Sequence, residues 1–121
     1  MSIFSEAQCK AILDKVIALS KADECTAVLT GGVNGNIRFA RNSVSTSGIV
    51  DDVELRVSVS FGKRTGSVTI NEFDDAALER AVRRAEDLAR LAPENPEFMP
   101  AIGKQEYRPS ATFSQATADL T

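Results

Sequence analysis

The clearest pattern in the chain is an alternation of apolar and polar residues over positions 53–70, interrupted by one glycine-containing turn. A period of two predicts two strands joined by a tight turn at residues 62–65. The inward residues of the first of these strands are Leu55, Val57, Val59 and Phe61. Because only one face is apolar, the pattern predicts an antiparallel sheet that is covered on one side.

Helical spacing of apolar residues flanks this region. Residues 6–20 carry an apolar stripe, and Ser5 with Gln8 makes a capping box at its start. A second helix is expected to begin after Asp74, which can cap it, and to end at Pro93. Its apolar face consists of Leu78, Ala81, Val82, Ala85, Leu88, Ala89 and Ala92. Its outer face holds charged residues, Glu86 among them, that form pairs and keep the face soluble.

The pattern is less regular between the first helix and residue 53. Residues 24–30 alternate as a strand, and the cluster GGVNGN at residues 31–36 predicts a turn. A further strand is expected from residue 36 to 47, with a bulge near Arg41 and Asn42. Asp51 and Asp52 would mark the next reversal. The resulting order, α-β-β-β-β-α, predicts an α+β fold: a four-stranded, mostly antiparallel sheet with two helices packed on one face.

The last quarter of the chain has a different composition, because all four prolines lie at or after position 93. We therefore expect residues 1–92 to form an α+β domain and residues 93–121 to form an extended linker. A helical pattern begins near Ser114 and does not develop into a full amphipathic stripe. This pattern suggests that the chain is a piece of a longer protein.

Composition narrows the classes of function. A net charge of −3 and a pI near 5.0 argue against a general nucleic-acid binder, which needs a basic surface. No apolar run approaches the roughly 20 residues that span a bilayer, and the first residues do not resemble a signal peptide. We therefore expect a cytoplasmic protein without a membrane partner. The chain has no histidine and two isolated cysteines, so a Ser-His-Asp triad, a Cys-His pair and an HExxH zinc site are impossible within it.

Three groups of polar residues are candidates for contact with a partner. Lys63 and Arg64 lie in the GKRTGS turn, which is read as a hairpin turn with exposed cations rather than as a phosphate-binding loop. Arg80 and Arg84 belong to the second helix, which offers either a solvated face or a docking surface for an acidic partner. Arg41 and Asn42 mark either an ordinary bulged strand or a polar edge that receives another chain.

Taken in order, several segments resemble the N-terminal domain of the TldD/PmbA family, once called modulators of DNA gyrase. The strongest are Arg41-Asn42, residues 62–69, residues 81–96 and the later Gln105-Glu106-Tyr107. The resemblance implies a cytoplasmic, dimeric parent protein several times longer than this chain. It also implies a zinc metallopeptidase that acts on peptides, with an HExxxH motif in a later region, or the partner subunit that lacks this motif.

From this resemblance we expect an N-terminal assembly and substrate-access domain of a metallopeptidase subunit, without the zinc-binding region. Its partners would be a second family subunit, in a homodimer or heterodimer, and a peptide substrate in the full assembly. No cofactor is expected in this chain, and zinc is implied only for the missing C-terminal region of a TldD-type subunit. The alternative is a stand-alone interaction module that uses a sheet edge or the arginine-bearing helix. Catalysis by this chain alone is not expected.

Overall fold

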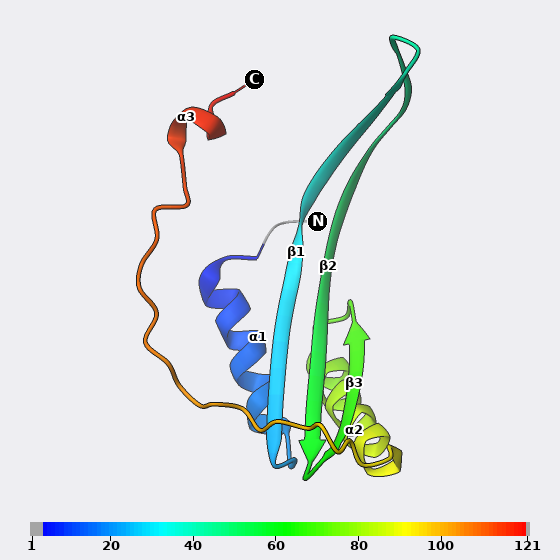
Figure 1. The fold of residues 1–121 in the computed structure, drawn as a ribbon, viewed down its shortest axis with the longest axis vertical. Coiled ribbons are helices and arrows are strands. Elements are labelled where there is room, and N and C mark those ends of the chain that lie inside the picture. Colours follow the sequence, from blue (N-terminus) through cyan, green and yellow to red (C-terminus); the bar gives the residue numbers. More distant parts are fainter. Residues whose placement is uncertain (1–3, 121) are drawn as a thin grey trace.

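The computed structural model describes residues 4–120 and arranges them as helices on one side of a small sheet, with a long hairpin projecting from it (Figure 1). The elements are α1 (Glu6–Leu19), β1 (Glu24–Ala40), β2 (Ser43–Phe61), β3 (Arg64–Ile70), α2 (Asp75–Leu91) and the short α3 (Gln115–Ala118). The α+β class is therefore as predicted. The capping box of α1 forms, and the Asp74 carboxylate accepts a hydrogen bond from the Ala77 backbone N–H at the start of α2.

The prediction of four strands is wrong, because the sheet has three antiparallel strands in the order β1-β2-β3. The expected turn at residues 31–36 lies inside β1, and the reversal expected at Asp51 and Asp52 lies inside β2. Their backbones pair with each other, since Gly32 stands opposite Asp52 and Val33 opposite Asp51. Ladder hydrogen bonds across the two strands thus outweigh the weak strand propensity of glycine and asparagine.

The chain reverses at Arg41 and Asn42, where the sequence predicted a bulge. Both residues have positive φ, 51° and 60°, and they form a two-residue loop between the paired Ala40 and Ser43. Two consecutive positive φ values are typical of the type I′ turn, whose twist matches that of a hairpin. The register shifts by one residue close by, where Arg38 pairs with Thr46 but Phe39 pairs with Val44.

The core lies between the helices and the lower half of the sheet. Leu55, Val57 and Val59 of β2 are buried against Leu78 and Val82 of α2, and α1 adds Val16. Helix α2 lies so close to β3 that a side-chain carbon at Gly66 would overlap the helix backbone at Ala85 and Ala89. A glycine in β3 is what permits this contact.

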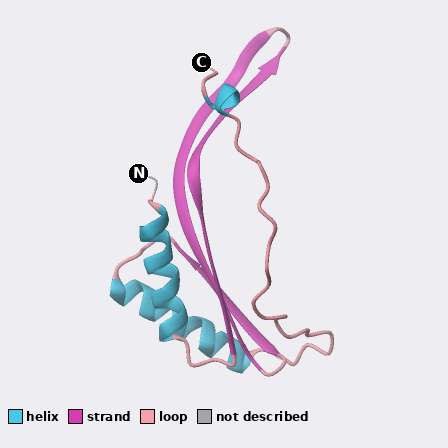
Figure 2. Cartoon of the chain, turned by 90° about the vertical axis from the view of Figure 1, so that its left-hand side faces the viewer, coloured by secondary structure: helices cyan, strands magenta, loops and turns pink. Residues whose placement is uncertain are grey.

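Beyond this core, β1 and β2 continue as a two-stranded ribbon, which we call the arm and define as residues 31–53. The arm extends well past α1 and β3 in both views (Figure 1 and Figure 2). Strand β3 pairs only with residues 55–61 of β2, and α1 reaches only the foot of the arm near Gly31 and Val53. Beyond that point the described residues place neither a third strand nor a helix beside the arm. The three-stranded part of the sheet, with its two helices, we call the base.

The chain leaves α2 as an extended tail, which is attached to the base at two points. The Asn95 backbone N–H donates to the Lys63 carbonyl at 3.0 Å, and the Ala101 N–H donates to Glu24 Oε1 at 3.1 Å. The tail then runs toward the end of the molecule where the arm has its tip (Figure 1). Its apolar residues Met99, Ile102 and Tyr107 are exposed, so they do not hold it against a surface.

Candidate protein-interaction surfaces

The six polar residues singled out in the sequence occupy three separate places. Arg41 and Asn42 form the tip of the arm, whereas Lys63 and Arg64 lie at the opposite end of β2. Arg80 and Arg84 project from the outer side of α2. The structure therefore does not bring them together into one site, and each pair has to be considered separately.

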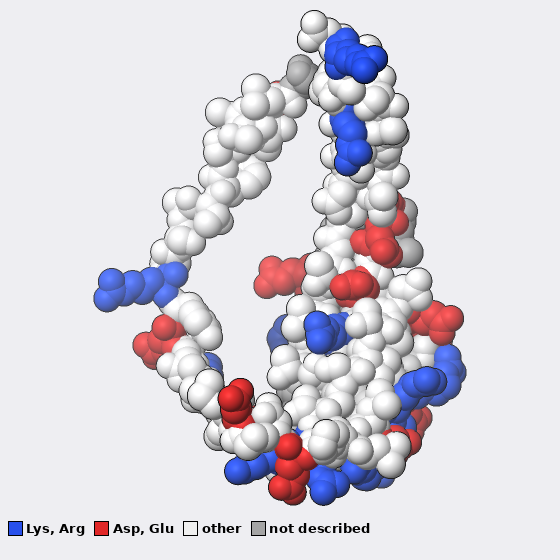
Figure 3. Space-filling view, turned by 45° about the vertical axis from the view of Figure 1, so that its right-hand side comes forward, with Lys and Arg blue, Asp and Glu red and all other residues white. Residues whose placement is uncertain are grey.

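The tip of the arm is basic and carries exposed positive charge (Figure 3). Arg41 has no hydrogen bond or ion pair with the described residues, and the nearby Arg38 is also exposed. The acidic side chains of the arm, Asp51 and Asp52, lie on β2 closer to the base, and Glu54 follows just beyond the arm. The arm is thus electrically polarised along its length, with a positive tip and a negative lower part.

The turn between β2 and β3 is engaged by other parts of the chain. The Gly62 N–H donates to Asp23 Oδ2 at 2.8 Å, and the Lys63 carbonyl accepts from the tail. Arg64 donates to the Arg90 carbonyl at 3.2 Å and lies 3.8 Å from Glu94. A phosphate-binding loop needs free backbone N–H groups. Because the Gly62 N–H is already used, the turn is better explained as an anchor for neighbouring loops.

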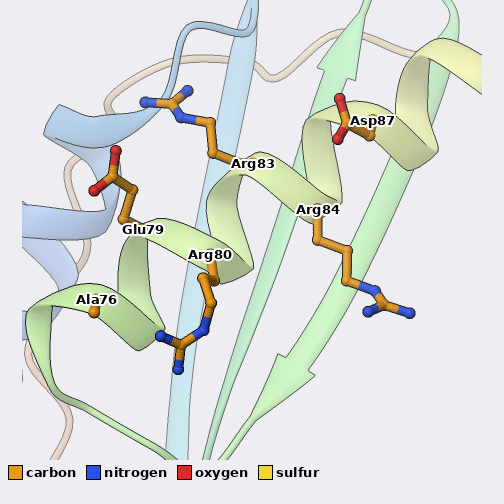
Figure 4. Close-up of a pocket in the computed structure, with 6 residues that line it drawn as sticks. All are labelled: Ala76, Glu79, Arg80, Arg83, Arg84 and Asp87. Carbon is orange, nitrogen blue, oxygen red and sulfur yellow. The ribbon is translucent and has the colours of Figure 1, made fainter.

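A shallow groove runs along the outer side of α2 and is lined largely by charged side chains (Figure 4). Its residues are Ala76, Glu79, Arg80, Arg83, Arg84 and Asp87. Arg80 pairs with Glu72 at 3.3 Å, whereas Arg84 has no ion pair with the described residues. The groove therefore offers one uncompensated cation, on a face that is otherwise largely neutralised.

Glu86 was expected on the soluble face of the second helix, and this prediction is wrong, because its side chain is only 1% exposed. Its carboxylate accepts from the Lys21 N–H at 2.6 Å and from Arg83 Nη1 at 2.7 Å. Burial alone would raise the pKa of Glu86, but these hydrogen bonds and the charges of Arg83 and Arg90 outweigh it and lower the pKa. Arg83 also donates to the Leu19 carbonyl at 2.8 Å, so the pair ties α2 to the end of α1.

The surface that sequence reasoning missed is the apolar side of the arm. Antiparallel partners point to the same side of a ribbon, and the core-facing alternation of Leu29 and Leu55 continues past the helices. There it exposes large apolar side chains: Ile37 is 62% exposed, Phe39 68% and Ile49 78%. Val33 and Val44 belong to the same face and are also exposed. We call these five residues the apolar arm face.

At the foot of the apolar arm face lies a small hollow between the arm and the start of α1. It is lined by Phe4, Cys9, Leu29, Gly31, Gly32 and Val53. The lining is almost wholly apolar. Gly31 packs so closely on Val53 that a side-chain carbon there would overlap it, whereas a side-chain carbon at Gly32 would meet no atom within 4 Å. A contiguous apolar surface of this kind is typical of a protein contact rather than of a solvated strand.

The described residues contain no cluster of three or more His, Cys, Asp or Glu side chains that could hold a metal ion. The chain also has no histidine, the usual nitrogen ligand of a zinc ion. Within residues 4–120, no helix is both long enough and apolar enough to cross a membrane.

Comparison with known proteins gives a match to a protein family and matches to solved structures. The sequence profile of the family described as PmbA/TldA metallopeptidase domain 1 matches residues 25–89, which is more than half of the chain. The crystal structure of TldE from Thermococcus kodakarensis superposes with a TM-score of 0.61 at 14% sequence identity. That match covers 84% of this chain but only 23% of TldE, so the chain spans about a quarter of the length of that relative. No curated protein matches significantly.

Proposed function

Since the chain belongs to the PmbA/TldD metallopeptidase family through its first domain, we propose that it is an assembly and substrate-access domain. In this proposal the domain holds a second family subunit and helps to enclose the peptide that the assembly cleaves. The observation that carries it is the apolar arm face, which projects from a well-packed base and lacks a cover of its own.

The division of the molecule supports this proposal. The base buries its apolar residues completely, as Leu55 and Val57 have no exposed surface. Apart from the buried Val53 at its foot, the arm repeats the same alternation without a layer to cover it. Apolar residues that only stabilise the domain are expected to be buried inside it. Apolar residues on a projecting ribbon are available to bind another polypeptide.

Hydrolysis itself is assigned to a region outside these 121 residues. Where a zinc ion acts in a peptidase, it activates water and polarises the carbonyl, and its ligands are histidine and carboxylate side chains. This chain has carboxylates but no histidine. We therefore propose that the isolated domain binds and positions without cleaving.

The proposal is tested by titrating the 121-residue chain against a purified TldD/PmbA-family subunit from the same organism, with calorimetry as the measurement. We expect binding, and we expect Ile37→Asp combined with Phe39→Asp to weaken it at least tenfold, because the arm then presents charge to an apolar contact. Val50→Asp is the matched control, since Val50 is 54% exposed on the opposite face of the same arm. Absence of binding, or equal losses in both variants, would contradict the proposal.

The lack of catalysis has its own test, in which the isolated chain is incubated with a peptide library in the presence and absence of a chelator. We expect no cleavage in either case. Chelator-sensitive cleavage by the isolated chain would contradict the assignment of hydrolysis to another region.

A second candidate function, a stand-alone module for an acidic partner, is favoured by the uncompensated Arg84 in the groove of α2. Its partner would carry carboxylates that pair with Arg84 and with Arg80. In this case Arg84→Glu would abolish capture of an acidic protein unrelated to peptidase subunits. Binding that is insensitive to Arg84→Glu would count against this function.

A further inference from the structure

A second groove lies on the base, between α2 and the outer edge of β3, and we call it the edge groove. Strand β3 is the last strand of the sheet, and no described segment pairs with its other side (Figure 1). The edge groove has a volume of about 210 Å³ and is lined by Val68, Ile70, Glu72, Ala77, Arg80, Ala81 and Arg84. An open strand edge and a groove therefore run side by side. This arrangement can accept an extended peptide as an additional strand.

The outer edge of β3 offers backbone groups for such pairing. Phe61 and Arg64 are partners on either side of a two-residue turn, which makes them a hydrogen-bonded pair of the antiparallel ladder. The alternation of that ladder directs the backbone N–H and C=O groups of Thr65, Ser67 and Thr69 away from β2. The described residues supply no other backbone partner for these groups. Strand β3 also contains no proline, the residue that often protects an exposed edge from further pairing.

The floor of the edge groove is apolar and only partly covered. Val68 and Ile70 lie on the helix side of β3 and are half-buried. Ala77 and Ala81 of α2 line the same groove and are buried. Because alanine is small, it leaves the space that a longer side chain at either position would fill. An added strand would therefore set an aliphatic side chain on this floor, at the level of Val68.

The rim of the edge groove is positively charged. Arg80 and Arg84 stand about one turn apart on α2, and both are exposed (Figure 4). Arg80 pairs with Glu72 at 3.3 Å, but both side chains are 66% exposed, so an incoming carboxylate can compete for this arginine. Arg84 has no ion pair with the described residues. Since side chains of a strand alternate, a carboxylate two residues from the aliphatic side chain would point to the same side and reach these arginines.

We propose that β3 accepts an extended segment of a protein partner as a fourth strand. An aliphatic side chain of that segment lies on the floor of the edge groove, and a carboxylate two residues away pairs with Arg80 or Arg84. The surface belongs to the base and is separate from the arm on which the assembly function depends. The inference rests on the second candidate function and deepens it, because it gives the acidic partner a conformation and a pattern of side chains.

A synthetic peptide with this pattern tests the inference. In acetyl-STVTETES-amide the valine and both glutamates fall on one side of a strand. We expect a fluorescein-labelled form to bind the 121-residue chain in an anisotropy titration, and to bind Arg84→Glu about tenfold more weakly because like charges then face each other. Arg56→Glu is the matched control, since it makes the same change in net charge at an exposed position on the opposite face of the sheet. No binding at millimolar peptide, or equal losses in the two variants, would overturn the inference.

Methylation of the peptide's backbone nitrogens tests strand addition itself. The N–H groups of an added strand point alternately toward β3 and away from it. Methyl groups on one alternate set of nitrogens therefore block the pairing, whereas methyl groups on the other set leave it intact. We expect one methylated peptide to lose affinity about tenfold or more and the other to keep it. Equal affinities of the two methylated peptides would overturn strand addition.

These experiments also separate the inference from the functions proposed above. If the two methylated peptides bind equally and Arg84→Glu still weakens binding, the edge groove holds an acidic partner by charge alone. The second candidate function then stands and strand addition is wrong. A peptide that does not bind overturns the inference and leaves the assembly function untouched, because that function is measured with a family subunit and variants of the arm.

Discussion

The base and the arm are built from the same two strands, yet they differ in everything that surrounds them. In the base, β1 and β2 are joined by β3 and covered by two helices, and Leu55 is completely buried. In the arm the same alternation continues, and Ile49 is 78% exposed. Backbone pairing alone is thus enough to form the two-stranded ribbon, whereas packing of the helices determines which part of it becomes a core. Apolar residues outside that cover are available for contact with other chains.

The largest expected effect comes from truncating matched apolar residues in the two regions. Leu55→Ala should lower the free energy of unfolding by about 2–5 kcal/mol, because it leaves a cavity under α2. Ile49→Ala should change it by less than about 0.5 kcal/mol in the monomer, because its side chain is exposed. Urea denaturation at low protein concentration measures both. Comparable losses would show that the arm is packed in solution.

Glycine substitutions provide a second comparison. Gly66→Ala should destabilise the base by about 1–3 kcal/mol or more, because the added methyl group meets the backbone of α2. Gly35→Ala in the arm should be neutral or slightly stabilising, since no atom lies within 4 Å of the added carbon. Thermal unfolding followed by circular dichroism distinguishes the two. A tolerated Gly66→Ala would contradict the close approach of helix and strand.

The buried carboxylate makes the stability of the base depend on pH. The pKa of Glu86 is lower in the folded chain than its ordinary value of 4.5. Its contribution is therefore present above about pH 4.5 and is lost as the pH falls through the lowered pKa. Glu86→Gln should be less stable than the parent at pH 7, and the difference should shrink on acidification. Denaturation at a series of pH values measures it, with the exposed Glu79→Gln as control. A constant difference would contradict the role of the charge.

The smallest effect is expected at the tip of the arm. Arg41 has a positive φ, which asparagine tolerates better. Arg41→Asn should slow hydrogen exchange of arm amides severalfold and leave the global free energy of unfolding nearly unchanged, because the arm can open without the base. Exchange followed by NMR gives both values. A matching rise in global stability would mean that arm and base unfold as one unit.

The base was predictable because its local signals agree with its final environment. The alternation over residues 55–61 and the spacing from Leu78 to Ala89 each match the period of the element that forms. The same signals located the covered face of the sheet. The local pattern is sufficient to predict the fold of a region in which every apolar residue becomes part of the core.

The arm was misread because its local signals conflict with its pairing. The cluster GGVNGN has the composition of a turn, and only pairing with residues 48–53 of the partner strand makes it a strand. Arginine is unusual in a type I′ turn, so Arg41 and Asn42 did not suggest a reversal. The apolar arm face went unnoticed for the same reason, since Val33 and Ile37 align only once the register is known.

The buried state of Glu86 was hidden for a different reason. Its spacing to Arg83 and Arg90 fits an ordinary ion pair on a helix surface. Burial comes from the loop after α1, whose Lys21 N–H reaches the carboxylate from 65 positions away. A contact of that sequence separation has no local signature.

The order of the chain also affects how the domain is made on the ribosome. Strand β1 and the apolar stripe of α1 are synthesised before α2, which supplies the other half of their core. The two strands of the arm can begin to pair at Ala40 and Ser43 as soon as they emerge, because the paired residues there are close in sequence. Until about residue 89 has left the tunnel, the nascent base exposes its interior. Chains released before α2 should therefore bind hydrophobic dyes and chaperones, and completed chains should not.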